Sequence, residues 1–158
     1  MSFEDWYRGA HPGLVAALTV VAGDRELACE ATDEAMVRAL ERWDRVAQMA
    51  SPTGWTYRVG VNVLRRRARR AAIERRLWRR DDAIAPPELQ PEVWDAIRSL
   101  PARQREAIAL RYLLDMTEAA VAEVMGIAVG TASATLANAR AALAVKLDAN
   151  NSDPVEVT

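Results

Sequence analysis

The chain has 158 residues, of which 51% are hydrophobic, and a formal net charge of -1. No apolar run approaches the roughly 18 residues that a membrane-spanning helix needs, and the acidic start of the chain is unlike a basic secretory signal. With Cys29 as its one cysteine, the chain can form neither an internal disulfide nor a cysteine-clustered metal site. We therefore expect a cytoplasmic protein without a metal, a cofactor, a membrane partner or a small-molecule substrate.

The charges are distributed very unevenly along the chain. Residues 1–57 carry five basic and nine acidic side chains, and residues 81–158 carry six basic and twelve acidic ones. Between them, residues 58–80 hold ten arginines and a single glutamate, a net charge of +9. A solvated helix face usually mixes the two signs in i,i+4 pairs, and here almost no acid is available for pairing. The basic block therefore favours a polyanion as the binding partner.

The amino-terminal half predicts three helices and one loop. Apolar residues at helical spacing predict a helix over 2–22 that stops at Gly23, and Asp24 can cap a second helix that ends at Trp43. In this second helix we place Leu40 on the buried apolar stripe. Residues 44–54 are predicted as a loop, and Ser51, Pro52 and Thr53 supply its turn and capping chemistry. A long helix is expected over 53–80.

The carboxy-terminal half predicts a prolyl linker followed by short helices. Three prolines between residues 81 and 91 argue against a helix there. Further helices are expected over 92–99, 102–114, 117–125 and 131–147. We therefore predict an all-α chain of two small helical domains, residues 1–80 and 92–149, with residues 81–91 as linker and residues 150–158 as a disordered tail.

The long basic helix is the first candidate for nucleic-acid binding. Arg58, Asn62, Arg66 and Arg69 follow one another at i+4 and i+3 steps, which places them on one side of the helix. Arg65 and Arg70 add to the same basic block. The rings of Trp55 and Tyr57 lie where they can stack on an exposed base, although each ring suits the core equally well.

The second candidate is a helix-turn-helix. Thr117 can cap a short helix, Gly126 suits the left-handed turn that ends it, and Thr131 can begin the next helix. In this arrangement the second helix enters the major groove of DNA, but plain helical bundles produce the same pattern. With Ala132, Leu136, Ala139 and Leu143 buried, its polar outward residues are Ser133 and Asn138.

Ordered motifs cover nearly the whole chain except the tail. In the carboxy-terminal half they are Leu100-Pro101-Ala102-Arg103-Gln104-Arg105-Glu106-Ala107 with Leu110-Arg111-Tyr112, then Val121-Ala122-Glu123-Val124-Met125-Gly126-Ile127, Gly130-Thr131 and Ala139-Arg140-Ala141-Ala142-Leu143. In the amino-terminal half they are residues 30–43 and Trp55-Thr56-Tyr57-Arg58-Val59 with Asn62. The first set resembles the fourth conserved region of extracytoplasmic-function sigma factors, and the second set resembles the second region of that family.

The resemblance implies an architecture and a set of partners. It implies a bundle like sigma region 2 whose helix with Glu30, Asp33, Glu34 and Arg38 binds the clamp of core RNA polymerase. The loop 44–54 and the basic helix would open the minus-ten element of promoter DNA and hold a flipped base, with Trp55 among the contacts. A helix-turn-helix like sigma region 4 would read the minus-thirty-five element through Thr131, Ser133 and Asn138. Many family members also bind an anti-sigma factor.

The chain departs from the family pattern at two places. The outward face of the helix 131–147 lacks the long basic side chains with which the family contacts bases and phosphates, so bidentate reading of guanine by arginine is absent. In the clamp-binding helix, Ala31-Thr32-Asp33 stands where the family favours larger apolar residues and a glutamine. From the first departure we expect a weak minus-thirty-five contact. The second departure argues against tight binding to polymerase.

Three functions can be compared at this stage. The first is a working transcription initiation factor with a weak minus-thirty-five contact. The second is a sigma-like regulator that has lost autonomous promoter reading and acts through protein partners. An enzyme is disfavoured, because the sequence has no nucleophile–base set and no phosphate loop.

Overall fold

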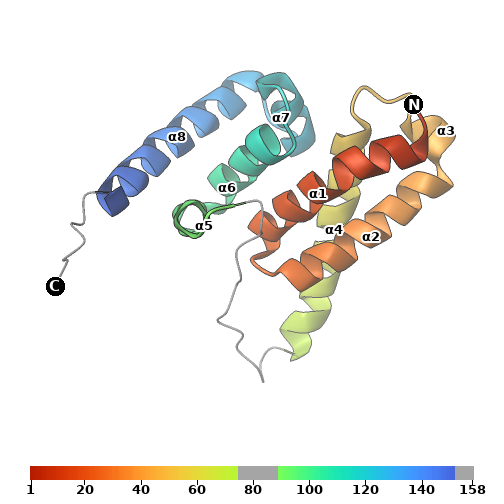
Figure 1. The fold of residues 1–158 in the computed structure, drawn as a ribbon, viewed down its shortest axis with the longest axis horizontal. Helices are drawn as coiled ribbons and strands as arrows, with labels where there is room; N and C mark the ends of the chain where they lie inside the picture. The colour runs from red at the N-terminus through yellow and green to blue at the C-terminus, as the bar shows by residue number, and fades with distance from the viewer. Residues whose placement is uncertain (75–88, 152–158) are drawn as a thin grey trace.

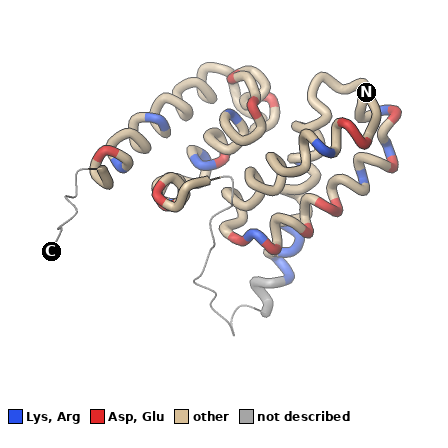
Figure 2. Tube along the Cα trace, viewed as in Figure 1, with Lys and Arg blue, Asp and Glu red and all other residues tan. Residues whose placement is uncertain are grey.

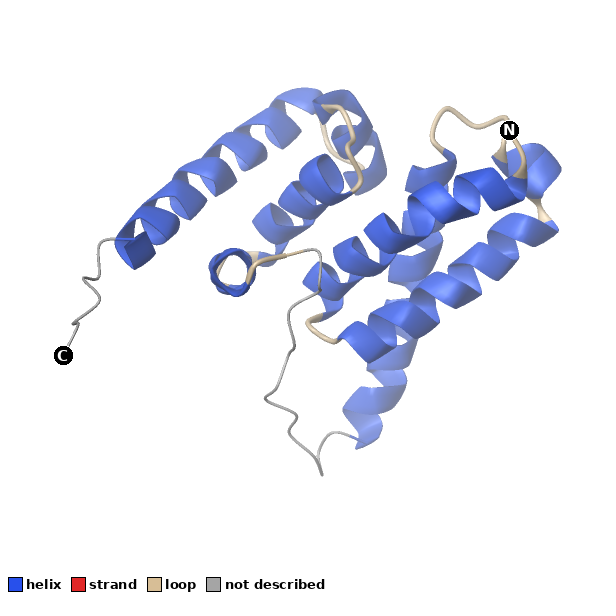
Figure 3. Cartoon of the chain, in the orientation of Figure 1, coloured by secondary structure: helices blue, strands red, loops and turns tan. Residues whose placement is uncertain are grey.

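The computed structural model describes residues 1–74 and 89–151, and every regular element within those two ranges is a helix (Figures 1 and 3). The all-α prediction is confirmed. Residues 75–88, which include most of the predicted linker and the predicted end of the basic helix, lie outside the described residues. So do residues 152–158 of the predicted tail. The domain boundaries that we placed at residues 80 and 91 stay predictions.

The amino-terminal helices begin and end where local chemistry favours it. Ser2 caps α1 (Phe3–Ala22) by accepting from the Asp5 amide at 3.1 Å, and Gly23 ends it in the left-handed conformation at φ 68°. Asp24 caps α2 (Arg25–Glu41) by accepting from the Leu27 amide at 3.0 Å. The short α3 (Trp43–Val46) begins at the predicted end of the second helix and runs into the predicted loop, and α4 (Pro52–Glu74) begins one residue earlier than expected.

The α1, α2 and α4 helices pack around one apolar core. Leu14, Leu18, Ala28 and Val63 are completely buried in it. Gly60 in α4 permits close packing, because a Cβ atom there would lie 2.6 Å from the Leu18 Cδ1 atom. At one end of the bundle, aromatic rings stack between α1 and α3, and the Trp6 indole donates to the Thr53 hydroxyl at 3.2 Å. These contacts fix the start of α4 against α1.

The carboxy-terminal helices differ from the prediction in three details. Pro91, which we assigned to the linker, is the first residue of α5 (Pro91–Arg98), where a proline is tolerated because its missing N–H would have no helical partner. The single helix expected over 102–114 is α6 (Ala102–Ile108) followed by a π-helical turn, η1 (Ala109–Leu113). The α7 helix (Glu118–Met125) follows, and α8 (Val129–Asn151) extends two residues into the predicted tail.

The two groups of helices contact each other. Trp94, Leu110, Val121, Leu136 and Ala139 form the core of the carboxy-terminal group. The α1 helix lies along α6 and η1, and α4 contacts α7 (Figure 1). Within the described residues no single helix is long and apolar enough to cross a membrane, and α7 and α8, which meet at 106°, pass that test only as a bent pair.

Candidate nucleic-acid and polymerase interface

The arginines of α4 divide into two sets with different surroundings. Arg58, Asn62, Arg65, Arg69 and Arg70 are exposed, and none of these arginines has an ion-pair partner among residues 1–74 and 89–151. Figure 2 shows the positive charges gathered toward the end of α4. An unpaired guanidinium in solvent is free to bind a phosphate oxygen. This part of the predicted DNA-binding surface is therefore open in the structure.

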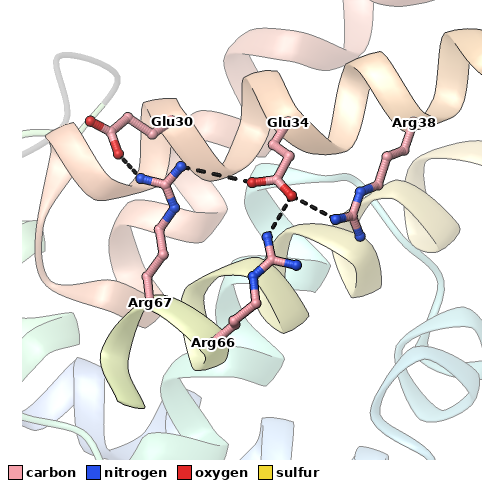
Figure 4. Close-up of polar contacts among 5 residues, drawn as sticks. All are labelled: Glu30, Glu34, Arg38, Arg66 and Arg67. Atoms are coloured by element: carbon pink, nitrogen blue, oxygen red, sulfur yellow. Dashed lines mark hydrogen bonds and ion pairs between the residues drawn. The ribbon is translucent and has the colours of Figure 1, made fainter. Parts of the chain in front are cut away.

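The second set lies against α2 (Figure 4). Arg66 donates to the Glu34 carboxylate at 2.5 Å, and Arg38 donates to the same oxygen at 2.6 Å. Arg67 pairs with Glu30 and reaches the second Glu34 oxygen at 3.7 Å. These five residues, Glu30, Glu34, Arg38, Arg66 and Arg67, are called the α2–α4 ion cluster below. The structure thus brings together predicted polymerase-binding and DNA-binding residues and pairs them with each other.

The charge of Glu34 is stabilised by this cluster. The hydrogen bond from Arg66 lowers the pKa of Glu34 below its ordinary value, and the positive charges of Arg66, Arg38 and Arg67 act in the same direction. Desolvation by burial acts in the opposite direction and raises the pKa, but it is a smaller effect than the hydrogen bond from Arg66. Glu34 is therefore ionised at neutral pH and holds α2 and α4 together.

The predicted clamp-binding face of α2 is only partly available. Asp33 is exposed, with its carboxylate 3.1 Å from the His11 imidazole. Val37 and Leu40 have exposed fractions of 55% and 54%. The placement of Leu40 on the buried stripe is wrong, because Thr32, Ala35, Met36 and Ala39 already fill the face toward the core. The sequence interpretation missed these two exposed apolar side chains, although their i,i+3 spacing places them on one face of α2.

The two aromatic residues at the start of α4 have different environments. Tyr57 has an exposed fraction of 1%, and its hydroxyl donates to the Glu106 carboxylate of α6 at 3.2 Å. Burial, reinforced by the Glu106 charge, raises the pKa of Tyr57 well above its ordinary value. Tyr57 is therefore a core residue. Trp55 is half-buried and lines a pocket of about 250 Å³ together with Ser51 and Arg58.

The second candidate has the geometry of a helix-turn-helix. The Thr117 hydroxyl caps α7 by accepting from the Ala120 amide at 3.2 Å, and Gly126 ends the helix at φ 66°. The bend between α7 and α8 is 106°, within the range of about 90–120° that such pairs adopt. The capping and turn chemistry expected from the sequence is therefore present.

The outward face of α8 offers few groups to DNA. Ser133 is only partly exposed and donates to the Glu118 carboxylate of α7 at 2.5 Å. This hydrogen bond lowers the pKa of Glu118, and the Arg140 charge adds to the effect. Arg140 donates to the Tyr112 hydroxyl at 2.6 Å. Ser133 therefore belongs to a contact within the helix-turn-helix, whereas Thr131 and Asn138 are exposed.

In the described ranges, no group of three or more His, Cys, Asp or Glu side chains could hold a metal ion. What the arrangement offers is binding chemistry: unpaired guanidinium groups, an acidic and apolar patch on α2, and a pocket between α4 and α7.

Comparisons with known proteins show what this chain is similar to. The family model "Sigma-70, region 4" matches residues 91–143, which contain α5 to the middle of α8. A curated relative, the RNA polymerase sigma-E factor of Streptomyces avermitilis, is 24% identical over 97% of this chain and 89% of its own length. Over residues 91–143 the chain matches the sigma-70 region 4 family model, and over nearly its whole length it is similar to sigma factors of the extracytoplasmic-function type.

Two solved structures share the fold of this chain. The sigma factor RpoE of Bartonella quintana, solved in complex with the anti-sigma factor NepR, is similar with a TM-score of 0.75 and 21% identity over 96% of this chain and 98% of that one. CnrH, solved in complex with the cytosolic domain of CnrY, is similar with a TM-score of 0.63 and 22% identity over 93% of this chain and 88% of that one. Both likenesses span α1 to α8, so the two helical groups together form the shared fold.

Proposed function

We propose that this sigma factor binds core RNA polymerase in the cytoplasm and directs it to promoters, gripping DNA mainly through α4 and making a weak minus-thirty-five contact through α8. The observation that carries the proposal is the exposed, unpaired arginine stripe of α4 in a chain of this family. Phosphate neutralisation supplies most of the non-specific affinity of a DNA-binding protein.

The polymerase contact is assigned to the outward face of α2. Val37 and Leu40 offer apolar area at its centre, and Asp33 and Glu41 lie on the exposed part of the same helix. Apolar contact surrounded by complementary charge is the usual arrangement of a specific protein interface. The α2–α4 ion cluster, which includes Glu30, Glu34 and Arg38, holds α2 against α4 and so fixes the position of this face. This assignment moves the centre of the predicted docking site from Glu34 to Leu40.

The promoter contact is divided between two surfaces of unequal strength. Arg58, Asn62, Arg65, Arg69 and Arg70 would hold the DNA backbone near the minus-ten element. The pocket beside Trp55 would receive an unstacked base, since an aromatic ring and a nearby cation suit a base and its phosphate. On α8, Thr131 and Asn138 remain for the minus-thirty-five element, and neither can make a bidentate arginine–guanine contact.

An anti-sigma factor is a further proposed partner. The RpoE and CnrH structures were each solved with a protein bound, NepR and the cytosolic domain of CnrY. The exposed apolar residues of α2 and the charged surface of α4 are the features that such a protein could cover here.

One observation favours a second candidate function. Because Ser133 is bonded to Glu118 and Arg140 to Tyr112, the helix-turn-helix uses its own polar side chains internally. A sigma-like regulator that binds polymerase without reading promoters needs no side chains on this helix-turn-helix for DNA. The unpaired arginines of α4 argue against it, because such a regulator has no use for a strong phosphate grip.

Run-off transcription with purified core polymerase and genomic promoter fragments separates the two functions. A transcript that depends on this chain establishes the initiation factor. If the chain binds core polymerase and no fragment yields a dependent transcript, the regulator is established instead.

A further inference from the structure

Arg66 is a paired arginine that lies beside unpaired ones on α4. Arg65 precedes it, and Arg69 and Arg70 follow one turn further along the helix. These three are exposed and have no ion-pair partner in the part of the chain that the structure describes. Arg66 itself donates to the Glu34 carboxylate of α2 at 2.5 Å, yet its side chain keeps an exposed fraction of 46% (Figure 4). Arg66 is therefore accessible to a phosphate group and already bound to a carboxylate.

The Glu34 carboxylate occupies Arg66 in the manner of a phosphate. Both groups are anions whose oxygens accept charge-assisted hydrogen bonds from a guanidinium group. Each arginine that binds a DNA phosphate raises the affinity and steepens its dependence on salt. Because Arg66 must exchange Glu34 for the phosphate, the existing ion pair offsets part of this gain. We therefore expect Arg66 to contribute less to DNA binding than Arg65 or Arg69 does.

Glu34 is held in position to compete with phosphate. Arg38 donates to the same Glu34 oxygen at 2.6 Å, and Arg67 lies 3.7 Å from the other oxygen. The lowered pKa of Glu34 keeps its carboxylate ionised at neutral pH. On the core side of the same helix, Ala31 and Ala35 are buried, so α2 is anchored in the bundle. A tethered carboxylate acts at a constant effective concentration and is not diluted as a free anion is.

We propose that Glu34 takes the place of a DNA phosphate on Arg66 and thereby limits how strongly α4 binds duplex DNA. The inference rests on the proposed function, because it concerns the same DNA-binding helix. The ligand whose access is limited is the phosphodiester backbone of any sequence, since the competition is between two anions and involves no base edge. Removing the charge of Glu34 should therefore raise the affinity for duplex DNA.

The test compares Glu34→Gln with the matched control Asp33→Asn, each in the full-length chain. Both variants remove one negative charge from adjacent positions of α2 and keep the size of the side chain. Within the described residues, however, Asp33 contacts His11 of α1 and no arginine of α4. Circular dichroism checks that the helical content is unchanged.

Fluorescence anisotropy over a salt series measures the binding of each protein to a fluorescein-labelled duplex of mixed sequence. Glu34→Gln should bind about three- to tenfold more tightly than the parent at low salt. Its slope of log affinity against log salt concentration should steepen by about one, which is the effect of one additional phosphate contact. Asp33→Asn should stay within about twofold of the parent, because salt screens a charge that touches no arginine of α4.

A third variant shows whether the gain in affinity depends on Arg66. Glu34→Gln with Arg66→Gln restores the net charge of the parent and removes the released guanidinium group. Its affinity and its salt slope should return to those of the parent. Glu34→Gln also frees Arg38, which this double variant retains. A gain that persists in the double variant would therefore overturn the assignment to Arg66.

A second comparison keeps the inference testable if Glu34→Gln does not fold. Arg69→Gln removes an unpaired guanidinium group and should lower the salt slope by about one. Arg66→Gln should lower it by clearly less, because the Arg66 guanidinium group is already occupied by Glu34. Equal losses in these two variants would overturn the inference.

The outcomes separate the inference from the proposed function. Equal affinities of Glu34→Gln and Asp33→Asn, in proteins that bind DNA, would overturn the inference and leave the proposed function standing. Measurable binding by Glu34→Gln alone would support the inference and refute the claim that the parent holds DNA through α4. Binding by none of the proteins would overturn both.

Discussion

The α4 and α8 helices are both 23 residues long and belong to the two halves of one chain, yet their surfaces differ greatly in charge. The α4 helix carries six arginines, four of them unpaired with any described residue, whereas α8 carries Arg140 and Lys146 and is otherwise nearly uncharged (Figure 2). On α8, the side chains of Ser133 and Arg140 are bonded to α7 and η1. The difference teaches that the geometry of a helix-turn-helix does not depend on long basic side chains on the outward face of its second helix.

The largest expected effect tests the first helix of this comparison. Changing Arg58, Arg65, Arg69 and Arg70 together to glutamine should weaken binding to duplex DNA by well over tenfold. The slope of log affinity against log salt concentration should fall by about one for each arginine that contacts a phosphate. Fluorescence anisotropy over a salt series measures both quantities.

The paired arginines of the same helix provide the control. Arg66→Gln with Arg67→Gln removes two charges that already have carboxylate partners, so the salt slope should change less than in a variant with Arg65→Gln and Arg69→Gln. Equal losses in the two double variants would show that position within α4 does not matter and that net charge alone attracts DNA.

The next effect concerns the binding of core polymerase, which is proposed to involve α2 and neither α4 nor α8. Leu40→Lys places a charge in the exposed apolar patch of α2 and should weaken binding to core polymerase by about tenfold or more, because central apolar contacts dominate interface energies. Its thermal unfolding midpoint should stay unchanged, since the side chain is 54% exposed. Val145→Lys, at a residue 71% exposed on α8, is the matched control. A pull-down in which both variants equal the parent would remove α2 from the interface.

A gain of function on α8 tests the same comparison between α4 and α8. Ala134→Lys with Asn138→Arg adds two long basic side chains to the exposed face of α8 without breaking the Ser133–Glu118 bond. We expect the affinity for duplex DNA to rise about tenfold and the salt slope to steepen by up to two. Val145→Lys with Ala149→Arg adds the same charge at the far end of the helix. If that pair raises the affinity equally, the face of α8 next to the turn has no special role.

The smallest effect concerns the α2–α4 ion cluster. Glu34→Gln should lower the free energy of unfolding by about 1 kcal/mol at pH 7, a value kept small because the cluster is partly exposed to solvent. The pKa of Glu34 is depressed in the folded state, so its stabilisation is present above the unfolded pKa and is lost as pH falls through the folded one. Urea unfolding of the parent and the variant should therefore differ at pH 7 and converge below about pH 4. A difference that persists at low pH would mean that packing, and not charge, is responsible.

Much of this architecture could be predicted from residues with a single local role. The ends of several helices could be predicted from local chemistry. Caps are provided by Asp24, Ser51 and Thr117, and left-handed ends by Gly23 and Gly126. The π-helical turn η1 could not be predicted, because its apolar residues suit an α-helix equally well.

The candidate site was harder to predict, because its properties depend on contacts between distant residues. Helical spacing placed Arg66 beside Arg58 and Arg69, but it could not show that Glu34, more than thirty residues earlier, binds Arg66. In the same way, Ser133 was expected to face outward until Glu118 proved to be within hydrogen-bond distance. Gly13 and Gly54 gave no signal at all. A Cβ atom on Gly13 would lie 2.8 Å from the Leu113 carbonyl oxygen, and one on Gly54 would lie 3.0 Å from the Val124 Cγ2 atom, and both contacts depend on the packing of one helical group against the other.

The central claim is that promoter DNA is held through α4 and only weakly through α8. It is tested most directly by transcription from a promoter that run-off assays have identified, using three templates: the intact sequence, one with a scrambled minus-ten element and one with a scrambled minus-thirty-five element. If the claim is right, scrambling the minus-ten element abolishes the transcript. Scrambling the minus-thirty-five element lowers the amount of transcript by less than about threefold, because no bidentate arginine contact is lost. A loss of the transcript on both scrambled templates would contradict it.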